Sequence, residues 1–107
     1  MSKPVRKYNT TITVSSGTGT LDLTNFRPLT YTGGYLEQIL IKAVQNDTEF
    51  DVAITDSDDY SVFDKDGCIG KVNDVTRIPV KGVYTVTISN ASKDGTFNIK
   101  LYLKEEW

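Results

Sequence analysis

Two stretches near the C-terminal end decide the fold: VYTVTISN at residues 83–90 and TFNIKLYL at residues 96–103. Apolar and polar residues alternate in both, so that Tyr84, Val86 and Ile88 share one side of the first stretch. Successive side chains of a β-strand point to opposite faces, and this alternation is typical of a strand with one buried face. Each stretch therefore predicts a strand, and the connection 91–95, which ends in Asp-Gly, predicts that the two form a hairpin.

Further segments toward the N-terminus show the same pattern. Pro79 cannot donate a hydrogen bond to a neighbouring strand, so the segment that contains it should lie at a sheet edge or a bulge. In the longest of these segments Phe50, Val52 and Ile54 share one face. We expect strands at residues 10–14, 20–24, 48–55, 60–64 and 76–80.

Residues 36–44 fit the spacing of a helix as well as that of a strand. We favour a strand, because Ile41 breaks the helical stripe and the neighbouring segments are all β. Eight short strands with turns between them predict an all-β fold, a single antiparallel β-sandwich of the jelly-roll or Greek-key type. We expect a basic N-terminal arm at residues 1–9 and one sandwich domain at residues 10–107.

The composition gives no general attraction to polyanions. Twelve basic and fourteen acidic residues leave a net charge of −2, so we expect no nucleic-acid partner. Residues 1–13 contain no continuous apolar stretch, which predicts no signal peptide, and no run is long enough for a membrane span. The charges are nevertheless arranged in patches, since residues 56–66 hold five acids and residues 3–7 hold three bases.

The residue types argue against catalysis. Histidine is missing, and Cys68 is the single cysteine, so Ser-His and Cys-His pairs and a two-thiol metal site are excluded. A catalytic carboxylate pair would need a cleft that a sandwich of this size has little volume to provide. We therefore expect no enzymatic activity and no cofactor, and we interpret Cys68 as a small, partly buried apolar residue.

The acidic stretch raises a calcium hypothesis, because hard cations bind carboxylate oxygens. Its spacing matches no complete EF-hand loop. We favour two solvated loops in which aspartate and glycine form turns. The residues that would bind the ion in the metal alternative are Asp56, Asp58, Asp64 and Asp66.

Both ends of the chain carry residues suited to protein contacts. The basic start could be a tail or an arm that crosses onto a neighbouring subunit. Aromatic residues near termini and loops can anchor protein contacts or stack on sugars, although we favour closure of the core as their role. The candidate partner-binding residues are Lys3, Arg6, Lys7, Tyr8 and Trp107.

Between residues 35 and 103, about two thirds of the chain, the order of motifs resembles small structural proteins of tailed bacteriophages. The motifs are YLEQI at 35–39, FDVAITD at 50–56, VF at 62–63, IPVKGVYTVTISNA at 78–91 and DGTF at 94–97. The resemblance implies a capsid decoration, or cement, protein that bridges subunits of the major capsid protein as a homo-dimer or homo-trimer. It implies a place in the virion after assembly in the host cytoplasm, and it carries over no catalytic residue.

Alternatives remain open at this point. The resemblance also covers sandwich proteins of the head-tail junction or of a fibre. A module that binds glycans through exposed aromatic residues belongs to a different class, as does an accessory domain of a larger secreted enzyme.

Overall fold

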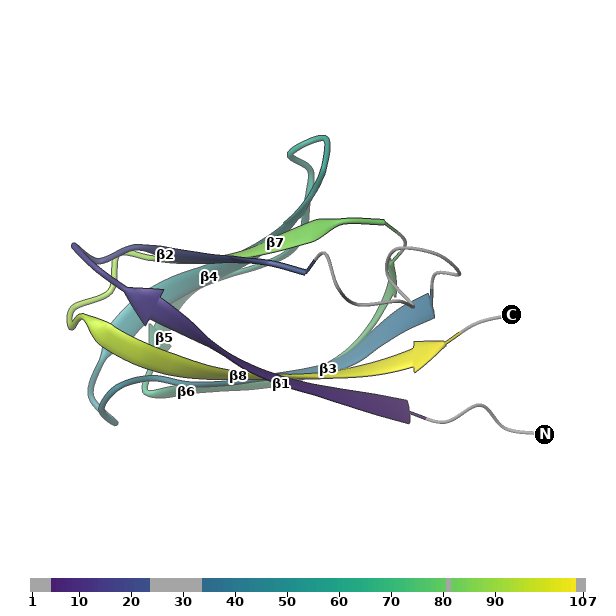
Figure 1. The fold of residues 1–107 in the computed structure, drawn as a ribbon. Helices are drawn as coiled ribbons and strands as arrows, with labels where there is room; N and C mark the ends of the chain where they lie inside the picture. The colour runs from purple at the N-terminus through teal and green to yellow at the C-terminus, as the bar shows by residue number, and fades with distance from the viewer. Residues whose placement is uncertain (1–4, 24–33, 81, 106–107) are drawn as a thin grey trace.

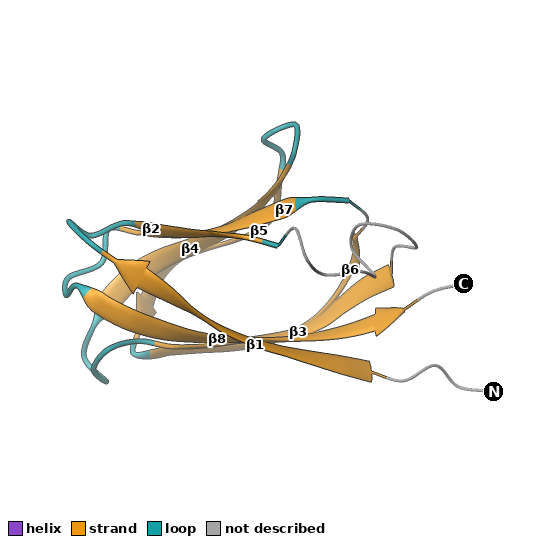
Figure 2. Ribbon diagram, viewed as in Figure 1, coloured by secondary structure: helices purple, strands orange, loops and turns teal. Residues whose placement is uncertain are grey.

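The structure is a computed structural model that describes residues 5–23, 34–80 and 82–105, and these residues form eight β-strands and no helix (Figures 1 and 2). No helix in this part of the chain is therefore available to cross a membrane. The predicted all-β fold is confirmed. The strands are β1 (Val5–Val14), β2 (Gly19–Asp22), β3 (Gly34–Lys42), β4 (Glu49–Asp56), β5 (Ser61–Ile69), β6 (Lys71–Val80), β7 (Tyr84–Ser89) and β8 (Gly95–Glu105).

Hydrogen bonds link the strands in the order β1-β8-β3-β6-β5-β4-β7-β2. Between β6 and β5 the register contains one pair, Ile69 with Lys71, and the ladder folds over there into two layers (Figure 1). We call β1-β8-β3-β6 the first sheet and β5-β4-β7-β2 the second sheet. Because β1 pairs with β8, β2 with β7, β3 with β6 and β4 with β5, the chain is one long hairpin rolled on itself. This is the jelly-roll form of the predicted β-sandwich.

The core lies between the two sheets and includes the inward side chains predicted from the alternation of residues 48–55, 83–90 and 96–103. In β4, Phe50, Val52 and Ile54 are each at most 1% exposed. Phe97 of β8 contacts Phe50 of the opposite sheet edge to face, with ring centroids 5.2 Å apart. Other large side chains of the core that are almost completely buried are Ile12, Ile39, Ile88, Ile99, Leu101, Leu103 and Val14.

The predicted hairpin of residues 83–90 and 96–103 is wrong. β7 pairs with β4 and β2, whereas β8 pairs with β1 and β3, so the connection between them crosses from one sheet to the other. Polar contacts to other loops hold this connection. The Asp94 carboxylate accepts hydrogen bonds from the backbone N–H groups of Ser16 and Gly17, and the Ser92 N–H donates to the carbonyl of Glu49.

Other predicted boundaries shift. The segment 36–44 is a strand, β3, as favoured, and Pro79 lies on an edge strand, because β6 pairs along its length with β3 alone. Both β5 and β6 are longer than predicted. Residues 5–9 of the predicted arm are the first half of β1 and pair with β8. The alternation of β1 extends back into this segment, since Tyr8 is half-buried between the exposed Lys7 and Asn9. Residues 1–4 lie outside the described residues.

Glycine at two corners allows the layers to close. Gly70 joins β5 to β6 with φ +71°, and a Cβ there would collide with the backbone of Asn46. Gly19 begins β2 where a Cβ would meet the Thr13 carbonyl and the side chain of Ile12. Both positions need a residue without a side chain.

Candidate binding surface

The two sheets carry opposite charge. The strands of the first sheet contain seven basic residues and three acidic ones, whereas those of the second sheet contain one basic residue and six acidic ones. The interior is apolar, so most of these charges lie on the outer faces of the sandwich. Although the net charge of the chain is only −2, one side of the sandwich is therefore basic and the other is acidic.

The outer face of the first sheet holds a groove of about 590 Å³. Its position follows from strand register, which sets Lys42 beside Asn98 on one side and Lys71 on the other. One row further along, Lys100 lies beside Leu40 and Asn9. We call this the lysine groove, and its outward side chains are Asn9, Thr11, Leu40, Lys42, Lys71, Asn73, Asn98 and Lys100.

No described acidic side chain neutralises the lysine groove. In the first sheet, Glu37 pairs with Arg77 at 3.5 Å and Asp74 pairs with Lys65 of β5 at 2.9 Å. The side chain of Glu105 is not among those that the structure describes. Among the described residues, Lys42, Lys71 and Lys100 have no ion pair. Lys42 and Lys71 moreover occupy directly opposite positions, an arrangement that destabilises a sheet by about 0.2–1 kcal/mol.

The outer face of the second sheet is acidic over β4 and β5. Asp66 lies close to Asp51 and Asp64, and their negative charges raise the pKa of Asp66. Asp51 behaves differently, because hydrogen bonds from the Asn90 side chain and the Gly67 N–H lower its pKa. We call Glu49, Asp51, Asp64 and Asp66 the acidic face.

The structure separates the residues of the calcium hypothesis. The Asp56 carboxylate accepts hydrogen bonds from the backbone N–H groups of Asp58 and Tyr60 at 2.9 Å, which is the turn role that we favoured. Asp64 and Asp66 lie instead on the acidic face. In the described part of the chain, no three histidine, cysteine, aspartate or glutamate side chains gather as metal ligands would.

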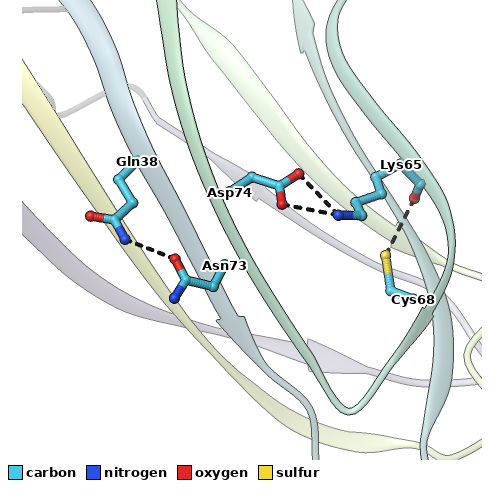
Figure 3. A network of polar contacts seen from close by, with 5 residues as sticks. All are labelled: Gln38, Lys65, Cys68, Asn73 and Asp74. Atoms are coloured by element: carbon cyan, nitrogen blue, oxygen red, sulfur yellow. Dashed lines mark hydrogen bonds and ion pairs between the residues drawn. The ribbon is translucent and has the colours of Figure 1, made fainter.

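The open side of the sandwich is where β5 and β6 separate. Lys65 and Asp74 reach across it, and their hydrogen bond raises the pKa of Lys65 (Figure 3). Cys68 lies nearby with its thiol directed at the Lys65 carbonyl (Figure 3), and burial raises the pKa of this thiol. A buried, protonated thiol is a poor nucleophile, which agrees with Cys68 as a small apolar residue.

The predicted partner residues have different environments. Lys7 is exposed on the first sheet opposite Tyr102, and Tyr8 is half-buried against the core. Tyr8 therefore contributes to core closure. Arg6 lies in β1 opposite Leu103. Lys3 and Trp107 lie outside the described residues, as does the side chain of Arg6.

Sequence reasoning missed the lysine groove altogether. Its three lysines belong to three strands that are far apart in the chain, and the strand pairing brings them together. The signal available in the sequence was the outward parity of Lys42 and Lys100 within alternating segments, but parity alone names no neighbour.

Comparisons with known proteins identify no family. No family model matches the chain, and no curated protein matches it. Among solved structures, dimeric latent PorU from Porphyromonas gingivalis superposes with a TM-score of 0.51 at 10% identity, covering 95% of this chain and 13% of PorU. The Drosophila NLP core gives a TM-score of 0.47 at 19% identity, covering 96% of this chain and all of the other. The infectious bursal disease virus Gx strain structure gives 0.35 at 10% identity, covering 98% of this chain and 33% of the other. These likenesses concern the fold alone.

Proposed function

We propose that the chain is a non-enzymatic structural protein of a tailed-phage virion, a capsid decoration protein that attaches to an acidic surface of the major capsid protein. The observation that carries the proposal is the basic edge of the first sheet. β1 pairs with β8 on one side only, and its first half contains Arg6 and Lys7. Lys3 precedes Arg6 by three residues in the sequence, and we call Lys3, Arg6 and Lys7 the basic edge. The choice of the major capsid protein as the partner rests on the resemblance to phage structural proteins.

An edge of this kind suits attachment to a protein lattice. Bridging subunits requires contact area and complementary charge in place of reactive groups. Lys7 lies beside the half-buried Tyr102 of β8, so a cation and an aromatic ring are presented together. Charge complementarity would orient the module on the shell, and the rigid ladder would hold the contact in one geometry.

Cosedimentation with purified capsids tests the attachment. The variant Lys3→Ala/Arg6→Ala/Lys7→Ala is preferable to deletion of residues 1–7, because deletion would remove part of the β1–β8 ladder. We expect the capsid affinity of this variant to fall about tenfold or more, in line with the loss of three charge contacts. A matched control, Thr20→Glu/Ser57→Glu/Val83→Glu, has the same net charge with all changes outside the basic edge, and it should bind like the unmodified chain.

Either of two results would overturn the proposal. If the unmodified chain stays in the supernatant with capsids at every salt concentration, the chain is not a decoration protein. If it pellets and the triple alanine variant pellets equally well, the basic edge is not the attachment surface. Circular dichroism of each variant confirms that the sandwich is intact.

The lysine groove favours one second candidate, a carbohydrate-binding module. The amides of Asn9, Asn73 and Asn98 line it and can hydrogen-bond sugar hydroxyls. No aromatic ring belongs to its lining, so the stacking surface common in sugar sites is missing from the described groove. An array of soluble glycans decides between the two functions, because a lattice-bridging protein needs no sugar affinity.

A further inference from the structure

The lysine groove concentrates positive charge on the outer face of the first sheet. It holds Lys42, Lys71 and Lys100 in about 590 Å³, and none of its lining residues is acidic. The direct opposition of Lys42 and Lys71 costs stability in the free chain. A contact that places carboxylates between these ammonium groups would convert that repulsion into attraction.

A surface of matching chemistry exists on the same chain. Glu49, Asp64 and Asp66 of the acidic face are exposed. The negative charges of Asp51 and Asp64 raise the pKa of Asp66, and neighbouring cations would relieve this repulsion. Each surface also presents one aliphatic side chain, Leu40 in the groove and the 62% exposed Ile69 opposite Glu49.

The two surfaces lie on opposite sides of the sandwich. The two sheets form the two layers of the sandwich (Figure 1), and the core lies between them. The groove is on the outer face of the first sheet, and the acidic face is on the outer face of the second sheet. A chain cannot therefore satisfy its own groove. Two copies joined by one such contact leave a groove free at one end and an acidic face free at the other, so the contact is heterologous and repeats.

We infer that copies of this chain associate head to tail, with the acidic face of one copy seated in the lysine groove of the next. The inference rests on the proposed role as a virion building block and adds the contact between its copies. The assembly closes as a ring of three or more copies or continues as an open chain, whereas a two-fold dimer does not use this contact. The basic edge of β1 remains available for the capsid.

A charge-swap experiment tests the contact in the absence of capsids. The groove variant is Lys42→Glu/Lys71→Glu/Lys100→Glu, and the acidic-face variant is Glu49→Lys/Asp64→Lys/Asp66→Lys. Asp51 is left unchanged, because its carboxylate accepts hydrogen bonds from Gly67 and Asn90 that the fold uses. Sedimentation velocity is measured for each protein alone and for an equimolar mixture of the two variants.

We expect the unmodified chain to associate at an ionic strength of about 0.01 M, where the Debye length is about 30 Å, and to dissociate at about 1 M, where it is about 3 Å. Each variant alone should sediment as a monomer. The mixture should associate, because the acidic face of one variant then meets the unmodified groove of the other, and the two reversed surfaces also match. This rescue is a result that a general loss of folding cannot produce.

Three results would overturn the inference: an unmodified chain that is monomeric at low salt, a mixture that stays monomeric, or a groove that binds a single-stranded DNA or acidic polysaccharide probe while the chain remains monomeric. Capsid cosedimentation is a separate measurement. A monomeric chain that still pellets with capsids through its basic edge would overturn the head-to-tail contact and support the proposed function.

Discussion

The two sheets of the sandwich are alike on the inside and opposite on the outside. The buried side chains of both sheets are aliphatic or aromatic apart from Cys68, and the edge-to-face pair of Phe50 and Phe97 joins the two sheets. Outward positions of the first sheet are rich in lysine and asparagine, and those of the second are rich in aspartate and threonine. The difference teaches that one alternating pattern serves two purposes here, since the inner residues determine the fold and the outer residues determine what the molecule can contact.

The largest expected effect on stability comes from a substitution in the core that the two sheets share. Phe97→Ala removes a ring that is 0% exposed and leaves a cavity against Phe50, so the free energy of unfolding should fall by about 3–5 kcal/mol. Urea denaturation followed by circular dichroism measures the loss. Phe97→Leu keeps most of the volume and should cost less, and equal losses for the two variants would show that the site does not depend on packing.

A smaller effect is expected where the two sheets join. Gly70→Ala introduces a Cβ at φ +71° and against the backbone of Asn46, so we expect a loss of about 1–3 kcal/mol from this strained corner. Thermal unfolding would report it. Gly67→Ala is a useful control, because Gly67 also has positive φ but a Cβ there meets no atom within 4 Å. If Gly67→Ala lowers the stability as much as Gly70→Ala does, the whole loss at Gly70 comes from its positive φ and none of it from the contact with Asn46.

On the outer face of the first sheet, removing one lysine should stabilise the fold. Lys71→Thr ends the repulsion with Lys42, and we expect a gain of about 0.2–1 kcal/mol. Lys104→Thr is the matched control, since Lys104 lies opposite Tyr35 and Val5 instead of another lysine. If Lys71→Thr brings no more stability than Lys104→Thr, the opposed lysines carry no cost in the free chain.

The smallest effect is expected on the exposed outer face of the second sheet and depends on pH. The pKa of Asp66 is raised above its ordinary value of 3.8, so ionised Asp66 destabilises the folded state at pH values above that raised pKa. Asp66→Asn should therefore stabilise the protein at pH 7. The gain should vanish as the pH falls below 3.8, where Asp66 is protonated in both folded and unfolded states. Thermal unfolding at both pH values measures the change, and a gain that persists at the lower pH would contradict this explanation.

Much of the fold could be predicted from the order of the residues, because a strand with one buried face alternates apolar and polar side chains. The alternation in β4, β7 and β8 identified the buried faces, and Pro79 identified an edge strand. The first half of β6 and the second half of β5 were missed. Both belong to edge strands with charged residues on each side of the pleat, including Lys65 and Asp74, and so the alternation there is weak.

The candidate binding residues could likewise be predicted only in part. The basic start of the chain was recognisable because Lys3, Arg6 and Lys7 are close in sequence. The lysine groove was not, because its charges come from three different strands.

The sequence by itself therefore determined that the chain forms alternating strands, which side chains face the core, and where the charges lie along each strand. Only the tertiary structure decided which strands pair. β7 and β8 look like a hairpin, yet they lie in different sheets, because the polar groups of residues 91–94 bond to other loops and the rolled arrangement buries every inward face at once. Pairing between distant strands depends on the packing of the whole core. This pairing also places the basic and the acidic residues on opposite sides of the molecule.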